Sequence, residues 1–231
     1  CRRLLDGYKG LDILVQPSPN RCFSDEEYTA EGITLSEDLS GCDTLLGVKE
    51  VRLDALVPDK TYFFFSHTAK EQPYNRGLLQ EIIRKRIRLI DYEYLVLGSE
   101  RVVAFGRWAG LVGAYNGLRG YGLKSGKFGL KPAHDCFDLA EFMDELDKVD
   151  PGTLRITVTG GGRVANGALD ILDAAGIRQV SPESFLENSF SSAVYTRLDP
   201  WHYTRRKDGS EFDFGHFVEN PGDYESTFDP Y

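Results

Sequence analysis

Residues 154–159, Leu-Arg-Ile-Thr-Val-Thr, run directly into residues 160–165, Gly-Gly-Gly-Arg-Val-Ala. The first six alternate apolar and polar side chains, which favours a strand, and apolar residues at helical spacing follow the glycines, which favours a helix. Between the two, Gly160, Gly162 and Ala165 form the pattern G-x-G-x-x-A. Strand, glycine turn and helix in this order predict a site for the phosphates of a dinucleotide.

Each position in this turn has a physical reason. Gly160 permits the tight turn, Gly162 lets a pyrophosphate approach the backbone, and the helix amides that begin at Arg163 and Val164 face the phosphates. An acidic residue for the adenosine ribose is expected about 20 positions further on. Glu183, after a short strand predicted at 178–180, is the candidate. NAD is the expected cofactor, with NADP left open, and the alternative is a plain strand-to-helix turn in another α/β domain.

Upstream of this turn, short apolar runs alternate with helical patterns, as in a domain with a mostly parallel sheet. The predicted strands cover residues 11–15, 44–48, 61–65 and 89–97. The run at 61–65 contains three consecutive Phe residues and should be buried on both faces. Ser24 and Glu27 form a capping box at the start of a short helix that ends near Gly32, and a second helix is expected over 74–86.

Small residues recur from Gly106 to Gly117, which predicts a helix that packs closely against a neighbour rather than one that binds a ligand. The Gly and Lys content of 118–132 suits a connection between domains. We therefore expect an N-terminal catalytic domain over 1–122 and part of a dinucleotide-binding domain over 123–231. Asp138 should open a helix in the second domain, whereas residues 201–231 allow no assignment. The predicted fold is two Rossmann-like α/β domains with mostly parallel sheets.

Composition limits the possible functions. The chain has 231 residues, is 41% hydrophobic and carries a net charge of -9, which opposes non-specific binding to nucleic acid. It has no apolar run near the roughly 20 residues of a membrane span, and no signal-peptide pattern at its start. The cysteines are scattered, without metal-binding spacing, at Cys1, Cys22, Cys42 and Cys136. These features predict a cytoplasmic protein without a metal site, and the sequence looks incomplete at both ends.

Three motifs in the first half resemble the N-terminal domain shared by alanine dehydrogenases, transhydrogenases and lysine-forming saccharopine dehydrogenases. They are Gly-Val-Lys-Glu at 47–50, Phe-Ser-His-Thr-Ala-Lys at 65–70, and Ile-Asp-Tyr-Glu at 90–93, and Arg-Val-Val-Ala-Phe-Gly follows at 101–106. The stretch from Arg101 to Ala114 is nearer to the saccharopine dehydrogenases than to the alanine dehydrogenases. This resemblance implies an NAD-dependent oxidoreductase that interconverts saccharopine with lysine and 2-oxoglutarate.

The residues support part of this chemistry by themselves. Lys49 and His67 follow adjacent predicted strands, whose carboxyl ends border the crevice where open α/β sheets bind ligands. Reduction or oxidation of an imine needs two proton-transfer groups, and Lys and His both serve as such. The resemblance implies that Lys49 handles the amine proton and that His67 activates water. It also implies that Arg101 binds a substrate carboxylate and that Phe105 lines the same pocket. Lys70 either faces that pocket or is a solvated residue at a helix start.

Other functions are weighed beside this one. Taken singly, a Lys near a strand end is more often a surface cation, and a His in a loop is more often structural. An alanine dehydrogenase-like activity on pyruvate and ammonia is the second enzymatic hypothesis, and a non-catalytic interaction module on the same scaffold is the third. The expected partners are small amino-acid and 2-oxo-acid substrates, without nucleic acid or membrane, and homo-oligomers are possible.

Overall fold

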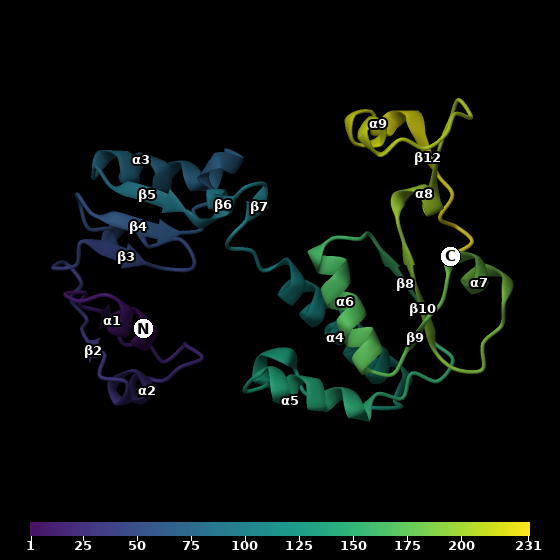
Figure 1. Ribbon diagram of the computed structural model, residues 1–231, viewed down its shortest axis with the longest axis horizontal. Coiled ribbons are helices and arrows are strands. Elements are labelled where there is room, and N and C mark those ends of the chain that lie inside the picture. Colours follow the sequence, from purple (N-terminus) through teal and green to yellow (C-terminus); the bar gives the residue numbers. More distant parts are fainter. The chain divides into compact units, whose positions relative to one another are not determined.

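The computed structural model describes residues 1–231, and the chain divides into two compact units, Cys1–Ala104 and Phe105–Tyr231 (Figure 1). Each unit contains a three-stranded parallel sheet together with helices, so the predicted α/β class with mostly parallel sheets is confirmed. The predicted domain boundary between residues 122 and 123 lies inside helix α4 (Gly106–Ser125). The residues from 118 to 125, where a connection was expected, continue this helix.

The larger sheet of the first unit has the strand order β3-β4-β5, all parallel (Figure 1). Its strands are β3 (Thr44–Leu46), β4 (Thr61–Phe64) and β5 (Arg88–Asp91), and helix α3 (Arg76–Arg84) packs on it. The core of this unit consists of Leu56, Tyr62, Phe64, Leu78, Ile82 and Ile87. Within β4 burial alternates, because Tyr62 and Phe64 are buried while Phe63 is half-buried, so the expected burial on both faces is wrong for Phe63.

The remaining elements of the first unit are short. They are α1 (Arg2–Gly7), β1 (Leu14–Val15), α2 (Asp25–Ala30), β2 (Thr34–Leu35), β6 (Val96–Leu97) and β7 (Glu100–Arg101). The capping box at the start of α2 is confirmed: Ser24 and Glu27 exchange both hydrogen bonds. The strand expected over 89–97 is wrong in its middle, because the Asp91 side chain accepts a hydrogen bond from the Glu93 amide and caps a 3₁₀ turn there.

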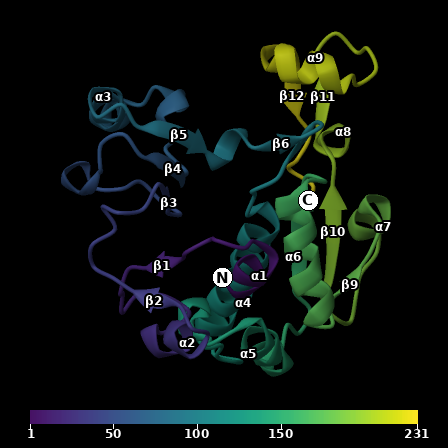
Figure 2. The same ribbon diagram turned by 60° about the vertical axis from the view of Figure 1, so that its left-hand side comes forward.

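In the second unit the parallel sheet has the order β8-β10-β9. Its strands are β8 (Arg155–Thr159), β9 (Arg178–Gln179) and β10 (Val194–Leu198). Helices α6 (Arg163–Ala174) and α7 (Pro182–Glu187) lie on opposite sides of β10 (Figure 2). The central strand is therefore the last of the three in the sequence, which decides what borders the glycine turn.

Helices α4 and α6 are in close backbone contact within the second unit. A Cβ atom on Gly110 would lie 1.9 Å from the carbonyl oxygen of Val164, and one on Gly167 would lie 2.0 Å from that of Arg107. No side chain larger than a hydrogen atom fits at either position. The interpretation of the small residues in α4 as a packing surface is thus confirmed. The core around this contact consists of Leu111, Tyr115, Leu118, Leu130, Phe142, Leu146, Ile171, Leu172, Ile177, Ala193 and Tyr195.

Residues 201–231, for which the sequence allowed no assignment, belong to a small structure at the end of the second unit. It contains α8 (Pro200–Tyr203), the antiparallel strands β11 (Thr204–Arg206) and β12 (Tyr224–Ser226), and α9 (Phe214–Glu219). Aromatic rings hold it together: Trp201, Phe212, Phe217 and Tyr224. Earlier in this unit, Asp138 caps α5 (Leu139–Asp144) as expected. None of the helices is long and apolar enough to pass through a membrane.

Candidate active site

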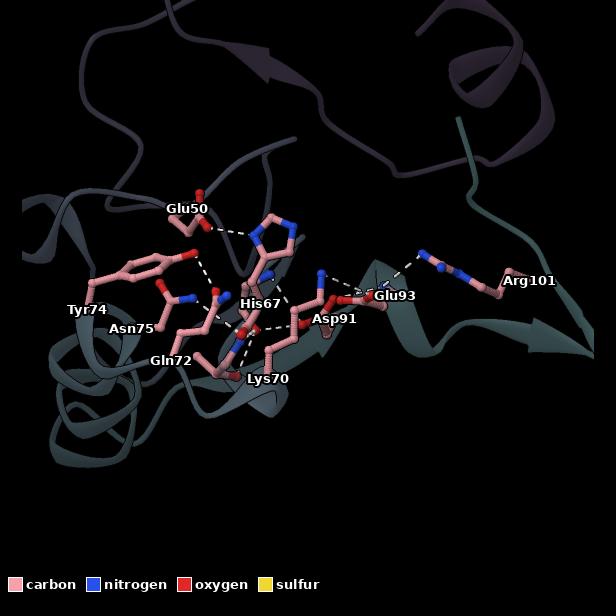
Figure 3. Close-up of polar contacts among 11 residues, drawn as sticks. Glu50, His67, Lys70, Gln72, Tyr74, Asn75, Asp91, Glu93 and Arg101 are labelled. Atoms are coloured by element: carbon pink, nitrogen blue, oxygen red, sulfur yellow. Dashed lines mark hydrogen bonds and ion pairs between the residues drawn. The ribbon is translucent and has the colours of Figure 1, made fainter. Parts of the chain in front are cut away.

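The three candidate motifs of the first unit meet at one edge of its sheet. Strands β3, β4 and β5 are parallel and adjacent, so the segments that follow them leave from the same edge. The Phe65 amide donates to the Val48 carbonyl at 3.1 Å, which extends the pairing of β3 and β4 beyond the strands themselves. Glu50, His67 and Glu93 come directly after these strand ends. Figure 3 shows their side chains and contacts.

His67 is held against Glu50. Its Nδ1 atom lies 2.8 Å from Oε1 of Glu50 (Figure 3). Its ring stacks on that of Phe65, with the centroids 6.3 Å apart. The backbone of His67 is left-handed, with φ of 54°, a conformation that few residues other than glycine adopt. The Asn75 side chain donates to the His67 carbonyl at 3.3 Å and helps to hold this conformation. Backbone strain of this kind is concentrated at functional sites.

The hydrogen bond between His67 and Glu50 has two consequences for proton transfer. It is the largest cause that holds the pKa of the Glu50 carboxyl below its ordinary value, so Glu50 is a carboxylate at neutral pH. A neutral His67 ring then places its proton on Nδ1, facing the carboxylate, and leaves the lone pair of Nε2 available. The His67 side chain is 24% exposed, so other molecules can reach it. This arrangement suits a general base.

Lys49 lies on the surface in the segment between β3 and Glu50. Its positive charge contributes, after the hydrogen bond from His67, to lowering the pKa of the Glu50 carboxyl. Glu50 is therefore a shared neighbour of the two predicted acid–base residues. Sequence reasoning gave Glu50 no role, although it stands next to Lys49 in the motif that was singled out.

The two predicted substrate-binding cations, Lys70 and Arg101, both lie near a second carboxylate, that of Glu93. Oε1 of Glu93 lies 3.5 Å from Nζ of Lys70 and 4.0 Å from Nη2 of Arg101 (Figure 3). The side chain of Glu93 is only 18% exposed, whereas those of Lys70 and Arg101 are 49% and 42% exposed. Sequence reasoning also missed Glu93, which is the last residue of the motif at 90–93. The structure thus brings Lys70 and Arg101 together but leaves both cations open to solvent.

Phe105 and the predicted cofactor residues belong to the second unit. Phe105 is the residue before α4 and is 54% exposed; its place in a substrate pocket stays a prediction. Gly160 follows β8 with φ of 93°, and Gly162 precedes α6. A Cβ atom on either glycine would meet no atom within 4 Å. With the exposed Arg163 and Val164 in the first turn of α6, this leaves room for a phosphate group at the helix amides.

Glu183 does not lie beside the glycine turn in the sheet. It follows β9, and β10 lies between β9 and β8. Hydrogen bonds from its own backbone amide and from the Ser181 hydroxyl lower the pKa of its carboxyl, as is usual at a helix start. Its contact with a ribose stays a prediction. The charged groups nearest to the turn come instead from the end of β10.

These charged groups are Arg197 and Asp199, which sequence reasoning missed. Their side chains form an ion pair of 2.5 Å, and a Cβ atom on Gly161 would lie 3.2 Å from Oδ1 of Asp199 and 3.4 Å from Nη1 of Arg197. No pattern in the sequence could have indicated this pair, because it depends on β10 inserting between β8 and β9. The ion pair therefore lies directly beside Gly161 of the turn.

Comparison with known proteins agrees with these features. Residues 1–112 match the family described as alanine dehydrogenase/PNT, N-terminal domain. The mitochondrial alpha-aminoadipic semialdehyde synthase of Bos taurus is 36% identical over 245 residues, which cover 96% of this chain and 26% of that protein. The saccharopine dehydrogenase [NAD(+), L-lysine-forming] of Yarrowia lipolytica is 28% identical over 193 residues, covering 76% of this chain and 52% of that protein.

The fold has a counterpart among solved structures. An L-alanine dehydrogenase superposes with a TM-score of 0.53 and 16% sequence identity, over 85% of this chain and 54% of that one. At this identity the likeness concerns the fold alone. The chain spans about a quarter of the length of the bovine relative, so that protein is much longer than the two units described here. Residues 1–112 match the alanine dehydrogenase/PNT N-terminal domain, and the resemblance that the three motifs indicate is confirmed.

Proposed function

We propose that the protein is an NAD-dependent oxidoreductase that acts on the C–N bond of an amino acid, converting saccharopine, NAD and water to lysine, 2-oxoglutarate and NADH. One observation carries this proposal: the hydrogen bond between His67 and Glu50 at the edge of the sheet where Lys70 and Arg101 also gather. The names of the bovine and fungal relatives support the choice of substrate. We assign the chemistry to the first unit and the binding of the cofactor to the second.

Lys49 would remove the proton from the substrate nitrogen. Saccharopine joins its two halves through a secondary amine, and oxidation of its C–N bond to an imine requires that this proton leave. A nicotinamide cofactor, when bound, would accept a hydride from the carbon. Lys49 is exposed, and its positive charge helps to lower the pKa of the nearby Glu50 carboxyl. The Glu50 carboxylate would in turn stabilise the ammonium that forms on Lys49.

His67 would activate the water that cleaves the imine. With Nδ1 bonded to Glu50, the lone pair of Nε2 takes a proton from water while the oxygen attacks the imine carbon. The imidazolium that results is stabilised by the adjacent carboxylate of Glu50. Return of this proton to the nitrogen leaves His67 neutral again, and the ring then takes the proton of the carbinolamine hydroxyl as the C–N bond breaks, which releases lysine and 2-oxoglutarate. Lys49 thus serves the oxidation of the amine, and His67 serves the hydrolysis of the imine.

Arg101 and Lys70 would bind substrate carboxylates. Arg101 presents a planar fork that matches a carboxylate, and its Nη2 is only loosely held by Glu93 at 4.0 Å. Lys70 contributes a second positive charge, because its Nζ lies 3.5 Å from the same Glu93 carboxylate. Gly160, Gly162, Arg163 and Val164 of the second unit would bind the pyrophosphate of the cofactor, because the glycine turn before α6 is open.

The proposal is tested in the natural full-length protein by following NADH absorbance with saccharopine and NAD. We expect NADH to form, and we expect it to be consumed by lysine plus 2-oxoglutarate. Pyruvate plus ammonia forms a separate arm, and NADP replaces NAD in a parallel series. Turnover with pyruvate and ammonia alone would replace the proposal by an alanine dehydrogenase. Absence of turnover in every arm, together with no binding of NADH or NADPH by calorimetry, would leave a non-catalytic interaction module.

A further inference from the structure

We propose that Asp91 is a positioning residue that fixes both His67 and Glu93 through its single carboxylate. Its importance for turnover rests on the proposed function, whereas its effect on the position of the His67 ring does not. Asp91 is the last residue of β5, and it touches neither of the proposed acid–base groups directly. The inference follows from the hydrogen bonds at its two oxygens.

The first oxygen, Oδ2, holds the start of the His67 loop. It accepts a hydrogen bond from the Ser66 amide at 3.2 Å and another from the Ser66 hydroxyl at 2.5 Å. Because that hydroxyl donates to Asp91, its oxygen is free to accept from Thr68, whose amide lies at 3.2 Å and whose hydroxyl lies at 2.8 Å. Ser66 and Thr68 flank His67, so both neighbours of the histidine are tied to one carboxylate.

The second oxygen, Oδ1, holds the other half of the site. It accepts a hydrogen bond from the Glu93 amide at 2.8 Å and caps the turn on which Glu93 lies. Glu93 in turn is the carboxylate that Lys70 and Arg101 share. Asp91 therefore links the loop that carries the proposed base to the turn that orients the proposed substrate-binding cations (Figure 3).

Chemistry requires a carboxylate at this position. Ser66 is fully buried, and all three groups that face Asp91 are donors. An ionised carboxylate has only acceptors, whereas an amide presents an NH₂ group to one set of these donors. An asparagine at position 91 would therefore lose the hydrogen bonds of one oxygen. The left-handed backbone of His67 needs such support in addition to the hydrogen bond from Asn75 to its carbonyl, because few residues other than glycine favour that conformation.

The test compares Asp91→Asn with Asp38→Asn in the natural full-length protein. Asp38 also accepts a backbone hydrogen bond, from Ser40 at 2.8 Å, but it lies on an exposed loop of the same unit. With saccharopine and NAD we expect Asp91→Asn to lower kcat about 100-fold, as for a catalytic group displaced by an ångström, while the affinity for NADH is kept. Asp38→Asn should leave both unchanged. Equal kcat values for Asp91→Asn and the parent protein would overturn the proposal.

A readout independent of activity separates this inference from the proposed function. In protein labelled with ¹⁵N-histidine, the signals of His67 are assigned by their absence from His67→Asn. Asp91→Asn should shift its ring nitrogen signals as the contact with Glu50 loosens, even if saccharopine is not the substrate. Unchanged signals would overturn the positioning role, whereas shifted signals in a protein without turnover would overturn only the proposed function.

Ser66→Ala provides a milder variant should Asp91→Asn fold poorly. It removes the hydroxyl that joins Asp91 to Thr68 but keeps the amide hydrogen bond to Asp91. We expect a smaller loss of kcat and a smaller shift of the His67 signals. Because both residues act through the same hydrogen bonds, the double variant should resemble Asp91→Asn alone. Additive losses in the double variant would contradict a shared network.

Discussion

Each of the two units is stabilised internally by a different kind of contact. In the second unit, α4 and α6 touch backbone to backbone at Gly110 and Gly167, where no side chain fits. In the first unit, the loops that carry His67 and Glu93 are held by carboxylates, with Asp91 at the centre and Glu50 on the histidine ring. Apolar packing of this kind tolerates no added volume, whereas the polar network tolerates no lost acceptor.

Because of this difference, we expect substitutions in the second unit to affect stability and substitutions in the first unit to affect turnover. Substitutions at the helix contact should lower the free energy of unfolding, since they change how the backbone packs. Substitutions of His67 and Glu50 should change turnover more than stability, because these two side chains are exposed or half-buried. Each of the following variants has a matched control that changes the same kind of residue without the contact in question.

The largest effect is expected for His67→Asn. Asparagine accepts the left-handed backbone of His67, so the loop should keep its shape. Loss of the base should lower kcat with saccharopine by about 100- to 10,000-fold. The matched control is His134→Asn, which replaces an imidazole whose side chain is 84% exposed and should leave kcat unchanged. Comparable losses in both variants would argue against a special role for His67.

The next effect is expected for Gly110→Ala. The new methyl group would lie 1.9 Å from the carbonyl oxygen of Val164, so α4 and α6 must move apart. We expect the free energy of unfolding to fall by about 3 kcal/mol, measured by urea denaturation. In Gly113→Ala, on the same helix, the methyl group meets no atom within 4 Å, and the free energy should rise by about 0.5 to 1 kcal/mol. Equal stability of the two variants would contradict the helix contact.

A smaller effect is expected for Tyr195→Phe in the core of the second unit. The hydroxyl of this fully buried tyrosine donates to Oδ1 of Asp173 at 2.6 Å, and burial raises the pKa of the phenol. Removing it should lower the free energy of unfolding by about 1.5 kcal/mol. Tyr74→Phe removes a hydroxyl that donates to Gln72 from a ring that is 73% exposed, and its stability should stay within experimental error.

The smallest effect concerns Glu50 and pH. The pKa of its carboxyl lies below the ordinary value of 4.5, mainly through the hydrogen bond from His67. The interaction therefore stabilises the fold above the unfolded-state pKa of Glu50, and this contribution is lost as the pH falls through the folded-state value. In His67→Asn the pKa of Glu50 should rise toward 4.5, as followed by ¹³C NMR of the carboxyl. An unchanged pKa would mean that other groups hold Glu50 in its ionised form.

Local signals in the sequence predicted local structure well. The capping box at Ser24 and the turn from Thr159 through the glycines to α6 both appear as expected, because each depends on residues within a few positions. The edge of the sheet that joins Glu50, His67 and Glu93 also followed from parallel strands read off the sequence. The placement of candidate residues after strand ends was therefore predictable.

What could not be predicted depends on contacts between distant segments. Glu183 was chosen by its separation from the glycine turn, but β10 inserts between their strands and brings Arg197 and Asp199 to the turn instead. The Gly and Lys content of residues 118–132 looked like that of a linker, yet residues 118–125 continue α4, one side of which packs in the core. Asp91 was quoted as part of a motif, but two of its three hydrogen bonds come from Ser66, which lies 25 positions earlier in the chain.

The state of the His67 ring is the most direct test of the proposed chemistry. The ¹⁵N chemical shifts of His67 in the wild-type protein report which ring nitrogen carries the proton once the ring is neutral. We expect the proton on Nδ1, bonded to Glu50, and a bare Nε2 that can accept a proton from water. A proton on Nε2 would contradict this, because the only nitrogen lone pair would then face a carboxylate and no base would remain for the water.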